Sequence, residues 1–301
     1  MNAPLETIFS QFGIQLYGCI PFSTCRITLA RKLPQQISLR AAIVFAIPYF
    51  PGEDPVRNIS LYAVPRDYHL YTRQLFPPLL QALQDTFPGA RFFGFSDNSP
   101  IDERTACVKA GLGIYGDNGL LITKPYGSFV FLAEILTDYT PEQLKESGTV
   151  YAEQSCEHCG ACQRVCPMRE NPFGISECLS ALTQKKQLDS AKEQAYIRQY
   201  GSAWGCDLCQ TVCPHNKLIL QNGVPCCLPF FREKRIFHLR YEQVAQMPDS
   251  LFKTRAFAWR GKQTVLRNLR ILEQSSTTSL QLSPVNNRRD AENLPKRTNK
   301  T

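Results

Sequence analysis

The stretch "CEHCGACQRVCP", residues 156–167, places four cysteines at gaps of two, two and three residues, and a proline follows the last one. This spacing is typical of ligands to a [4Fe–4S] cluster, because short CxxC loops let several sulfurs converge on one cluster. A second run, "CDLCQTVCP" at residues 206–214, supplies three more cysteines and again ends in proline. Together the two runs predict a ferredoxin-like domain.

With Cys178 between the runs, eight thiolates are available, which is enough for two [4Fe–4S] clusters. In two-cluster ferredoxins the last cysteine of a run serves the other cluster. This crossing assigns the first cluster to Cys156, Cys159, Cys162 and Cys213, and the second to Cys166, Cys178, Cys206 and Cys209. Zinc is the alternative metal, but zinc sites are built from paired CxxC motifs. The other cysteines lack such spacing: Cys19, Cys25, Cys107, Cys226 and Cys227.

Charge is unevenly distributed along the 301 residues, whose net charge is +8. From Phe231 to Thr301 there are 15 Lys and Arg against 6 Asp and Glu. This surplus suggests a polyanionic partner such as nucleic acid, although a solvated basic face is the alternative. No run of 18 apolar residues and no secretory leader are found, so we expect a cytoplasmic protein without a membrane span.

The hydrophobic pattern of the first half mixes strands and helices. It predicts strands at 41–50 and 91–97, a helix at 67–87 broken at Pro77-Pro78, a helix at 100–113, and a hairpin at 119–138. The predicted fold class is therefore α+β. The expected domains are 1–145 for catalysis, 146–230 for the double-cluster ferredoxin-like domain, 231–272 for a basic helical segment, and 273–301 for a disordered tail.

A pure electron carrier of the ferredoxin type needs far less chain than this. Two clusters would form a path for electrons, and such a path implies an acceptor in a partner protein or in the first 145 residues. The length upstream of the cysteines therefore favours an enzyme. An electron carrier with an attached binding domain remains the alternative.

Several stretches in one order resemble the epoxyqueuosine reductase family. They are "PRDYHLYTRQL" (65–75), "SDNSPIDERTACVKAGLGIYGDNGLLI" (96–122), "GSFVFLAEILTD" (127–138), "ECLSALTQKK" (177–186), "GCDLCQTVCPHN" (205–216) and "RAFAWRGKQTVLRNLRIL" (255–272). Together with the first cysteine run, the resemblance covers about residues 40–272.

This resemblance implies an N-terminal corrinoid-binding domain of α/β type, two [4Fe–4S] clusters, and base-off cobalamin without a protein ligand to cobalt. The implied reaction is the reduction of epoxyqueuosine to queuosine in tRNA, the last step of queuosine biosynthesis. The implied partners are tRNA and an external low-potential electron donor, with no membrane. The alternative enzymatic interpretation is a reductase that acts on a small molecule, like the reductive dehalogenases.

The resemblance also implies roles for single residues. Asp97 matches the family's proton donor, so we expect burial beside the corrin to raise its pKa; an Asx turn before Pro100 is the alternative. The expected cofactor contacts are Asp67, Tyr68, His69, Asp97, Asn118 and Gly119. For Asp67 the alternative is a helix cap, and for residues 117–119 it is an ordinary turn.

Two departures from the family pattern concern tRNA and the corrin. The helical repeats of the family's long form are missing, so the basic segment is the expected tRNA contact through Arg255, Arg260, Lys262, Arg267 and Arg270. Asp117 stands where the family usually carries a basic residue.

Overall fold

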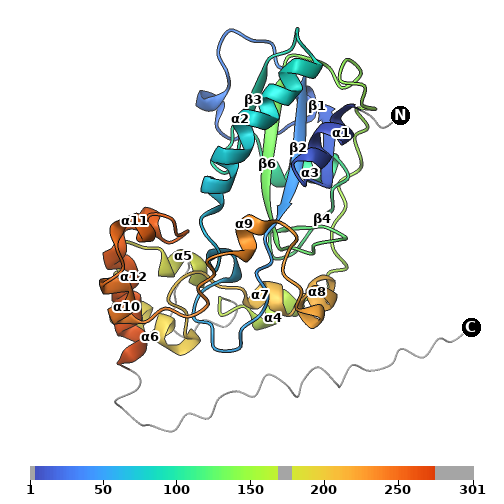
Figure 1. The fold of residues 1–301 in the computed structure, drawn as a ribbon. Helices are drawn as coiled ribbons and strands as arrows, with labels where there is room; N and C mark the ends of the chain where they lie inside the picture. Colours follow the sequence, from blue (N-terminus) through green and yellow to red (C-terminus); the bar gives the residue numbers. More distant parts are fainter. Residues whose placement is uncertain (1–3, 169–177, 275–301) are drawn as a thin grey trace, which may run out of the picture.

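The computed structural model of the protein describes residues 4–168 and 178–274. A four-stranded antiparallel sheet in the order β1-β2-β6-β3 occupies the upper half of Figure 1. Its strands are β1 (Leu16–Pro21), β2 (Ala41–Pro48), β6 (Val130–Thr137) and β3 (Phe92–Phe95). The predicted strands at 41–50 and 91–97 are confirmed, and so is the mixture of helices and strands.

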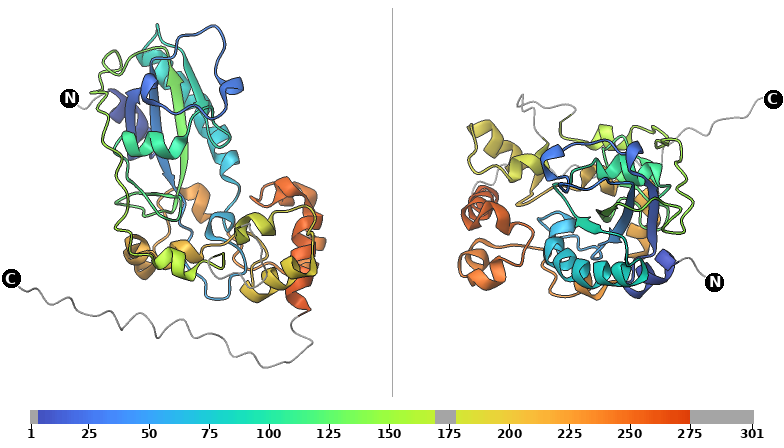
Figure 2. Two further views of the ribbon diagram at one scale, coloured as in Figure 1. Left: turned by 180° about the vertical axis from the view of Figure 1, so that it is seen from behind. Right: turned by 90° about the horizontal axis from the view of Figure 1, so that it is seen from above.

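Helices cover both faces of the sheet because strand β2 is apolar on both sides. Ile43 and Phe45 join the cluster formed with α1 (Pro4–Gln11) and α2 (Tyr68–Thr86). Ala42 and Val44 point the other way, since strand side chains alternate, and they pack with α3 (Glu103–Lys109). Views from behind and above show these layers around the sheet (Figure 2).

Helix α2 is continuous, so the predicted break at Pro77-Pro78 is wrong. Both prolines lie on the exposed side of the helix, whereas Leu75, Leu79 and Leu83 are buried against the sheet. The carbonyl groups that lack a hydrogen bond because proline has no N–H therefore face water, which can satisfy them. Packing of the leucine face offsets the cost that proline imposes within a helix.

The predicted hairpin at 119–138 is wrong as well. Strand β5 (Leu121–Ile122) pairs with β4 (Ile114–Tyr115), and β6 pairs with β2 and β3. Only an isolated bridge between Thr123 and Gly127 joins the two sides of the turn. Helix α3 begins later than the sequence suggested, because Asp102 caps it by accepting from the Thr105 N–H.

Short helices form the lower half of the molecule in Figure 1. They are α4 (Ala161–Val165), α5 (Leu179–Thr183), α6 (Ala191–Tyr200), α7 (Leu208–Thr211), α8 (Lys217–Asn222), α9 (Pro229–Arg232), α10 (Tyr241–Ala245), α11 (Asp249–Phe252) and α12 (Lys262–Glu273). Single 3-10 turns occur at Phe22–Thr24, Ala30–Lys32, Leu61–Ala63, Pro214–Asn216 and Ala258–Arg260. Nearly all of the predicted tail lies outside the described residues.

Hydrophobic packing crosses the domain boundaries expected at 145 and 230. Ile59 and Val64, from the first half, pack with Trp204 and Phe257. In return, Phe231 belongs to the core beside the sheet. Each half of the molecule thus contributes a segment to the other. Within the described residues, no helix has the length and apolar character needed to cross a membrane.

Asp207 joins the two halves by a buried ionic contact. Its carboxylate is 1% exposed and accepts from Arg57 Nη1 at 2.8 Å and from the Leu61 N–H at 2.7 Å. The Ser60 hydroxyl also donates to it. Because Asp207 lies between Cys206 and Cys209, the loop at 57–61 helps to position the second cysteine run.

Asn216 makes the second polar link between the halves. Its side-chain oxygen accepts from the Ser128 N–H at 2.8 Å, and its amide group donates to Ser128 Oγ and to the Gln210 carbonyl. A Cβ at Gly127 would lie 2.0 Å from the Asn216 oxygen, so this close approach requires glycine.

We expect Asp207→Ala to lower the free energy of unfolding by about 3 kcal/mol, because the largely buried Arg57 would lose its closest charged partner and keep only Glu53 at 3.7 Å. Asp189→Ala is the matched control. The Asp189 carboxylate is 76% exposed in its pair with Lys185, so its loss should cost less than about 1 kcal/mol. Urea unfolding followed by tryptophan fluorescence measures both, and equal losses would contradict the role of Asp207.

Candidate active site

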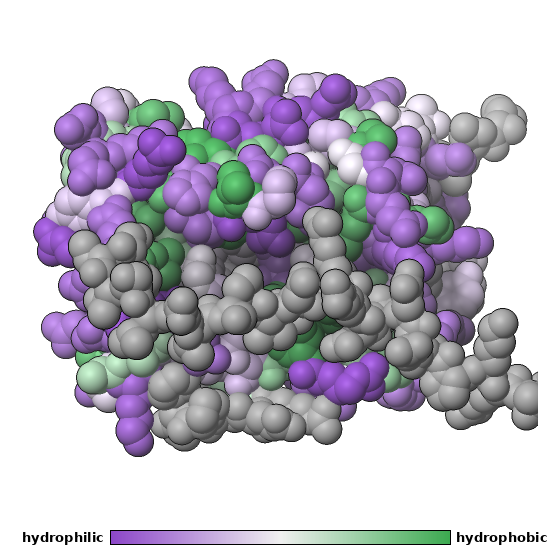
Figure 3. Space-filling view, turned by 90° about the horizontal axis from the view of Figure 1, so that it is seen from below, coloured by the Kyte–Doolittle hydropathy of each residue, from purple (hydrophilic) through white to green (hydrophobic). Residues whose placement is uncertain are grey.

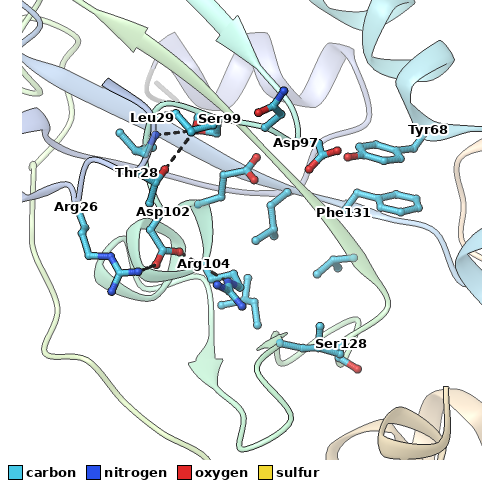
Figure 4. Close-up of a pocket in the computed structure, with 17 residues that line it drawn as sticks. Arg26, Thr28, Leu29, Tyr68, Asp97, Ser99, Asp102, Arg104, Ser128 and Phe131 are labelled. Carbon is cyan, nitrogen blue, oxygen red and sulfur yellow. Dashed lines mark hydrogen bonds and ion pairs between the residues drawn. The ribbon is translucent and has the colours of Figure 1, made fainter. Parts of the chain in front are cut away.

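A cavity of about 460 Å³ opens beside the end of strand β3. Its wall includes Tyr68, Asp97, Glu103, Arg104, Leu120 and Phe131. Four chain segments that lie far apart in the sequence therefore meet there: residues 26–29, the start of α2, the stretch from the end of β3 into α3, and the stretch from 120 to β6. Figure 4 shows the labelled side chains around this space.

The loop that carries Asp97 has an unusual backbone. Asp97 and Asn98 adopt φ values of 55° and 46°, a left-handed conformation that Asp and Asn tolerate better than most residues. The loop is anchored next to them, because the Ser99 hydroxyl donates to the Glu134 carboxylate and Thr28 Oγ1 donates to the Ser99 carbonyl. Strained backbone held in this way is a common feature of functional sites.

His69 lies between two carboxylates. Its Nδ1 is 2.8 Å from Asp67 Oδ1, and its Nε2 is 3.6 Å from Asp97 Oδ2. The hydrogen bond with Asp67 and the nearby carboxylate of Asp97 raise the pKa of His69 to about 9. In turn, the approach of His69 lowers the pKa of Asp97.

The interaction with His69 therefore opposes the rise in the pKa of Asp97 that burial beside a corrin would cause. The Asp97 side chain is 63% exposed, so burial is too slight to outweigh the His69 interaction. At neutral pH the proton of this pair lies on His69.

Tyr68 and Asp67 hold the start of helix α2 at the cavity. Asp67 caps the helix by accepting from the His69 N–H at 3.0 Å, as the alternative reading predicted. The Tyr68 ring stacks on Phe131 with 4.1 Å between ring centroids, and its hydroxyl points toward Asp97 (Figure 4). Tyr68 and Asp97 line the cavity, whereas Asp67 and His69 stand behind Asp97.

The turn at residues 116–120 separates this cavity from a second one. Leu120 lines the first cavity, and Asn118 lines the second. Gly119 lies between them with φ +77°, and its carbonyl accepts from Arg104 Nη1 at 3.0 Å. Of the two expected cofactor contacts in this turn, Asn118 thus faces the second cavity.

The second cavity brings together the four cysteines predicted for the first cluster. Its wall contains Cys156, Cys159, Cys162 and Cys213. Cys213 belongs to the second run, so the chain crosses between the runs here. The backbone N–H of Asp117 donates to Cys156 Sγ at 3.4 Å, and such a contact stabilises a thiolate.

Asp117, the acid at a usually basic position, has a partner within the first cysteine run. Its Oδ1 is 2.8 Å from His158 Nδ1, and His158 Nε2 is 2.9 Å from Ser155 Oγ. Asp117, Cys156 and His158 place their ligand atoms within 4.8 Å of one another. The carboxylate is therefore held by the cysteine loop and faces away from the Asp97 cavity.

The cysteines predicted for the second cluster influence one another electrostatically. Burial, followed by the charges of neighbours that include Cys178 and Cys166, raises the pKa of Cys206 to about 11 and that of Cys209 to about 12. Cys226 and Cys227 lie outside both groups, near Tyr71 and Tyr126. Cys19 and Cys107 are buried in the sheet domain.

The five basic residues expected to contact tRNA do not form one free surface. Arg255 is fully buried and donates to the carbonyls of Lys234 and Val64, so that prediction does not hold. Arg267 donates to the carbonyls of Lys185 and Lys186. Lys262 donates to the Met247 carbonyl and pairs with Asp249.

Two of the five keep accessible positions. Arg260 lies over the ring of Trp259, which is 60% exposed, at 3.9 Å. Arg270 is exposed beside Tyr241. Seen from below, the coloured surface is mostly hydrophilic, with separate apolar side chains between (Figure 3).

Sequence reasoning missed two acids, Glu103, which lines the cavity, and Glu134, on strand β6. Glu134 has no exposed surface. It is the only charged residue in the otherwise apolar stretch "VFLAEIL" of β6. Acids are rarely buried in a strand, so this position was a detectable signal in the sequence. For Glu103 and for the Asp117–His158 pair, the sequence contains no comparable signal.

Comparison with known proteins identifies one group of relatives. The chain is 33% identical over 202 residues to an epoxyqueuosine reductase of Gloeobacter violaceus, which covers 62% of this chain and 60% of that protein. An Escherichia coli protein of the same name is 34% identical over 164 residues, or 53% and 41% of the two chains. This chain spans about three fifths of the first curated relatives it matches. No family model matches it.

Solved structures show the same fold. The epoxyqueuosine reductase of Streptococcus thermophilus superposes with a TM-score of 0.70 at 22% identity, covering 90% of this chain and 81% of that one. An epoxyqueuosine reductase solved with an epoxyqueuosine-modified tRNA stem loop gives the same TM-score and identity, over 89% and 79%.

We expect the His69 imidazole to titrate with a midpoint of about 9 in the NMR spectrum. Asp67→Asn should move the midpoint toward the ordinary value of about 6.5, whereas Asp85→Asn, at the exposed far end of α2, should not. Because the folded pKa is raised, this interaction stabilises the fold fully below about pH 6.5 and is lost as the pH rises through about 9. A wild-type midpoint near 6.5 would contradict the pairing.

Proposed function

Because the chain is a homologue of the epoxyqueuosine reductases, we propose that it reduces epoxyqueuosine to queuosine in tRNA. The observation that carries the proposal is the closeness of two cavities. One contains Asp97 and Tyr68, the other is lined by four cysteines, and the stretch at 117–122 contributes residues to both walls. An electron path and a site for acid catalysis thus meet in one chain.

Two [4Fe–4S] clusters suit the donor sets. Four thiols around one cavity match the ligand requirement of a four-iron cluster, and we assign Cys166, Cys178, Cys206 and Cys209 to the second cluster. Crossing by Cys213 and Cys166 would bring the clusters close together. An external low-potential donor would supply the electrons.

Cobalamin fits the Asp97 cavity. The wall combines apolar side chains such as Leu120, Leu121 and Val130 with Arg26 and Arg104 at its edge, a mixture suited to an apolar macrocycle with polar substituents. None of the described residues that line it is a histidine, and both ring nitrogens of His69 face carboxylates. This agrees with a cobalt that has no protein ligand.

The bound cofactor would supply the redox chemistry of cobalt, fed by single electrons. The protein would supply protons and orientation. Removing the epoxide oxygen as water consumes two electrons and two protons. Asp97 is placed to pass a proton from protonated His69 to the leaving oxygen. Tyr68 would orient the substrate from the same wall.

A tRNA substrate agrees with the basic C-terminal segment and places the reaction in the cytoplasm. A solved relative holds a modified tRNA stem loop. In this chain Arg260 and Arg270, with exposed Trp259 beside Arg260, offer accessible cations and an aromatic face, groups that bind phosphates and stack on bases. Arg255 takes no part in this surface.

Reconstituted protein should contain about eight iron atoms per chain, corresponding to two four-iron clusters. Cys213→Ser should remove the first cluster, and Cys206→Ser the second, each lowering iron and sulfide by about half. Cys227→Ser, an exposed cysteine outside both groups, should keep the full content. Iron analysis and EPR spectra test the assignment, and loss of iron in Cys227→Ser would contradict it.

The decisive experiment is nucleoside mass spectrometry of tRNA from a strain that lacks its own reductase. Expression of this chain should convert epoxyqueuosine to queuosine. Asp97→Asn should lower the rate by at least about 100-fold, since general acid catalysis contributes that much, and it should leave both cluster signals intact. Asp189→Asn is the control. Unconverted epoxyqueuosine with the wild-type chain refutes the proposed function, and clusters without cobalamin binding would favour an electron carrier.

A further inference from the structure

Glu103 and Glu134 form a carboxyl pair beneath the Asp97 loop. Glu134 lies at the centre of the sheet, opposite Val44 on β2 and Phe95 on β3, and has no exposed surface. Glu103 is the first residue of α3 and lines the cavity. The pair thus extends from the core of the sheet to the wall of the site.

One oxygen on each side chain lacks any other partner. Glu103 Oε1 and Glu134 Oε2 are buried and receive no hydrogen bond from a described donor, yet the two carboxyl groups lie within hydrogen-bonding reach of each other. Two ionised carboxylates in this position would repel each other. A proton between them would satisfy both oxygens at once.

Among residues 4–168 and 178–274, no cation forms an ion pair with Glu103 or Glu134. Asp97 and Asp102 add negative charge near Glu103. The nearby guanidinium groups of Arg26 and Arg104 pair with Asp102, at 3.1 and 3.7 Å. The other titratable groups that the pair influences are neutral acids of high pKa, namely Tyr68, Cys25 and Cys107.

The Glu103–Glu134 pair therefore stays at least partly protonated at neutral pH. Burial raises the pKa of Glu134 well above its usual range, so Glu134 stays neutral. Burial also raises the pKa of Glu103, but a hydrogen bond from Glu134 opposes the rise, and the result is about 7. Glu103 can thus release and regain a proton under ordinary conditions, which is the property of an efficient general acid.

We propose that Glu103 is a second proton donor to the cavity and that Glu134 is the positioning residue that holds it. This inference rests on the proposed function. When the two C–O bonds of an epoxide break and two electrons enter, an alkene and water form, and the oxygen takes up two protons. Asp97 supplies one proton and Glu103 the other. Glu103 regains its proton from water through the open side of the cavity, and Asp97 regains its own from His69.

The first test is an infrared titration, which requires neither cofactor nor turnover. Between pH 6 and 8, the wild-type protein should lose one carbonyl band of a protonated carboxyl group, with a midpoint of about 7. Glu103→Gln should abolish this titrating band, and Glu134→Gln should abolish a band that persists at pH 8. Glu142→Gln, which removes an exposed acid, should change neither band. Wild-type spectra without a titrating carboxyl band would overturn the proposal.

The second test measures turnover of the loaded enzyme. Glu103→Gln should lower kcat by about 100-fold with little change in KM, and it should remove the decline in rate that the wild type shows as the pH rises above about 7. Glu103→Gln with wild-type kcat and pH profile would overturn the donor role. A titrating band in a chain that does not reduce epoxyqueuosine would support the acid pair and refute the proposed function, so the two failures are distinguishable.

Discussion

The carboxylate of Asp207 is the contact on which the arrangement of the two halves depends. It is buried, and it accepts hydrogen bonds from three residues of the loop at 57–61, namely Arg57, Ser60 and Leu61. Since it stands between Cys206 and Cys209, the same residue that secures the loop also sets the path of the cysteine run. The geometry of the second cysteine run is thereby tied to the fold of the sheet domain.

The cysteine groups could be predicted from the sequence because ligand spacing is local. Gaps of two and three residues restrict which sulfurs can converge, and the crossing of Cys213 toward the first run follows from a recurrent pattern. Long-range pairing is different. The hairpin expected at 119–138 has suitable turn residues, but β6 gains more by pairing along its full length with β2. The turn residues alone could not indicate that β6 would pair with a strand far away in the sequence.

Electrostatic expectations failed where they depended on tertiary contacts. The expected effect on Asp97 was burial beside a corrin, and nothing local in the sequence indicates that His69, from another element, approaches Asp97 and lowers its pKa. Arg255 counts as a cation in any tally of charge, yet it serves as a buried donor to backbone carbonyls. Net charge therefore overstates the basic surface offered to a polyanion.

The stretch at 117–122 lines both cavities, with Leu120 and Leu121 on one side and Asn118 and Ile122 on the other. Under the proposed function, electrons would have to pass from the cysteine cavity to the Asp97 cavity, while the sulfur ligands would have to be kept from the substrate. A wall formed by one short stretch of chain meets both requirements, because it separates the two cavities with few residues. We therefore expect inserted residues to be tolerated least at this turn, although turns of this kind usually accept insertions.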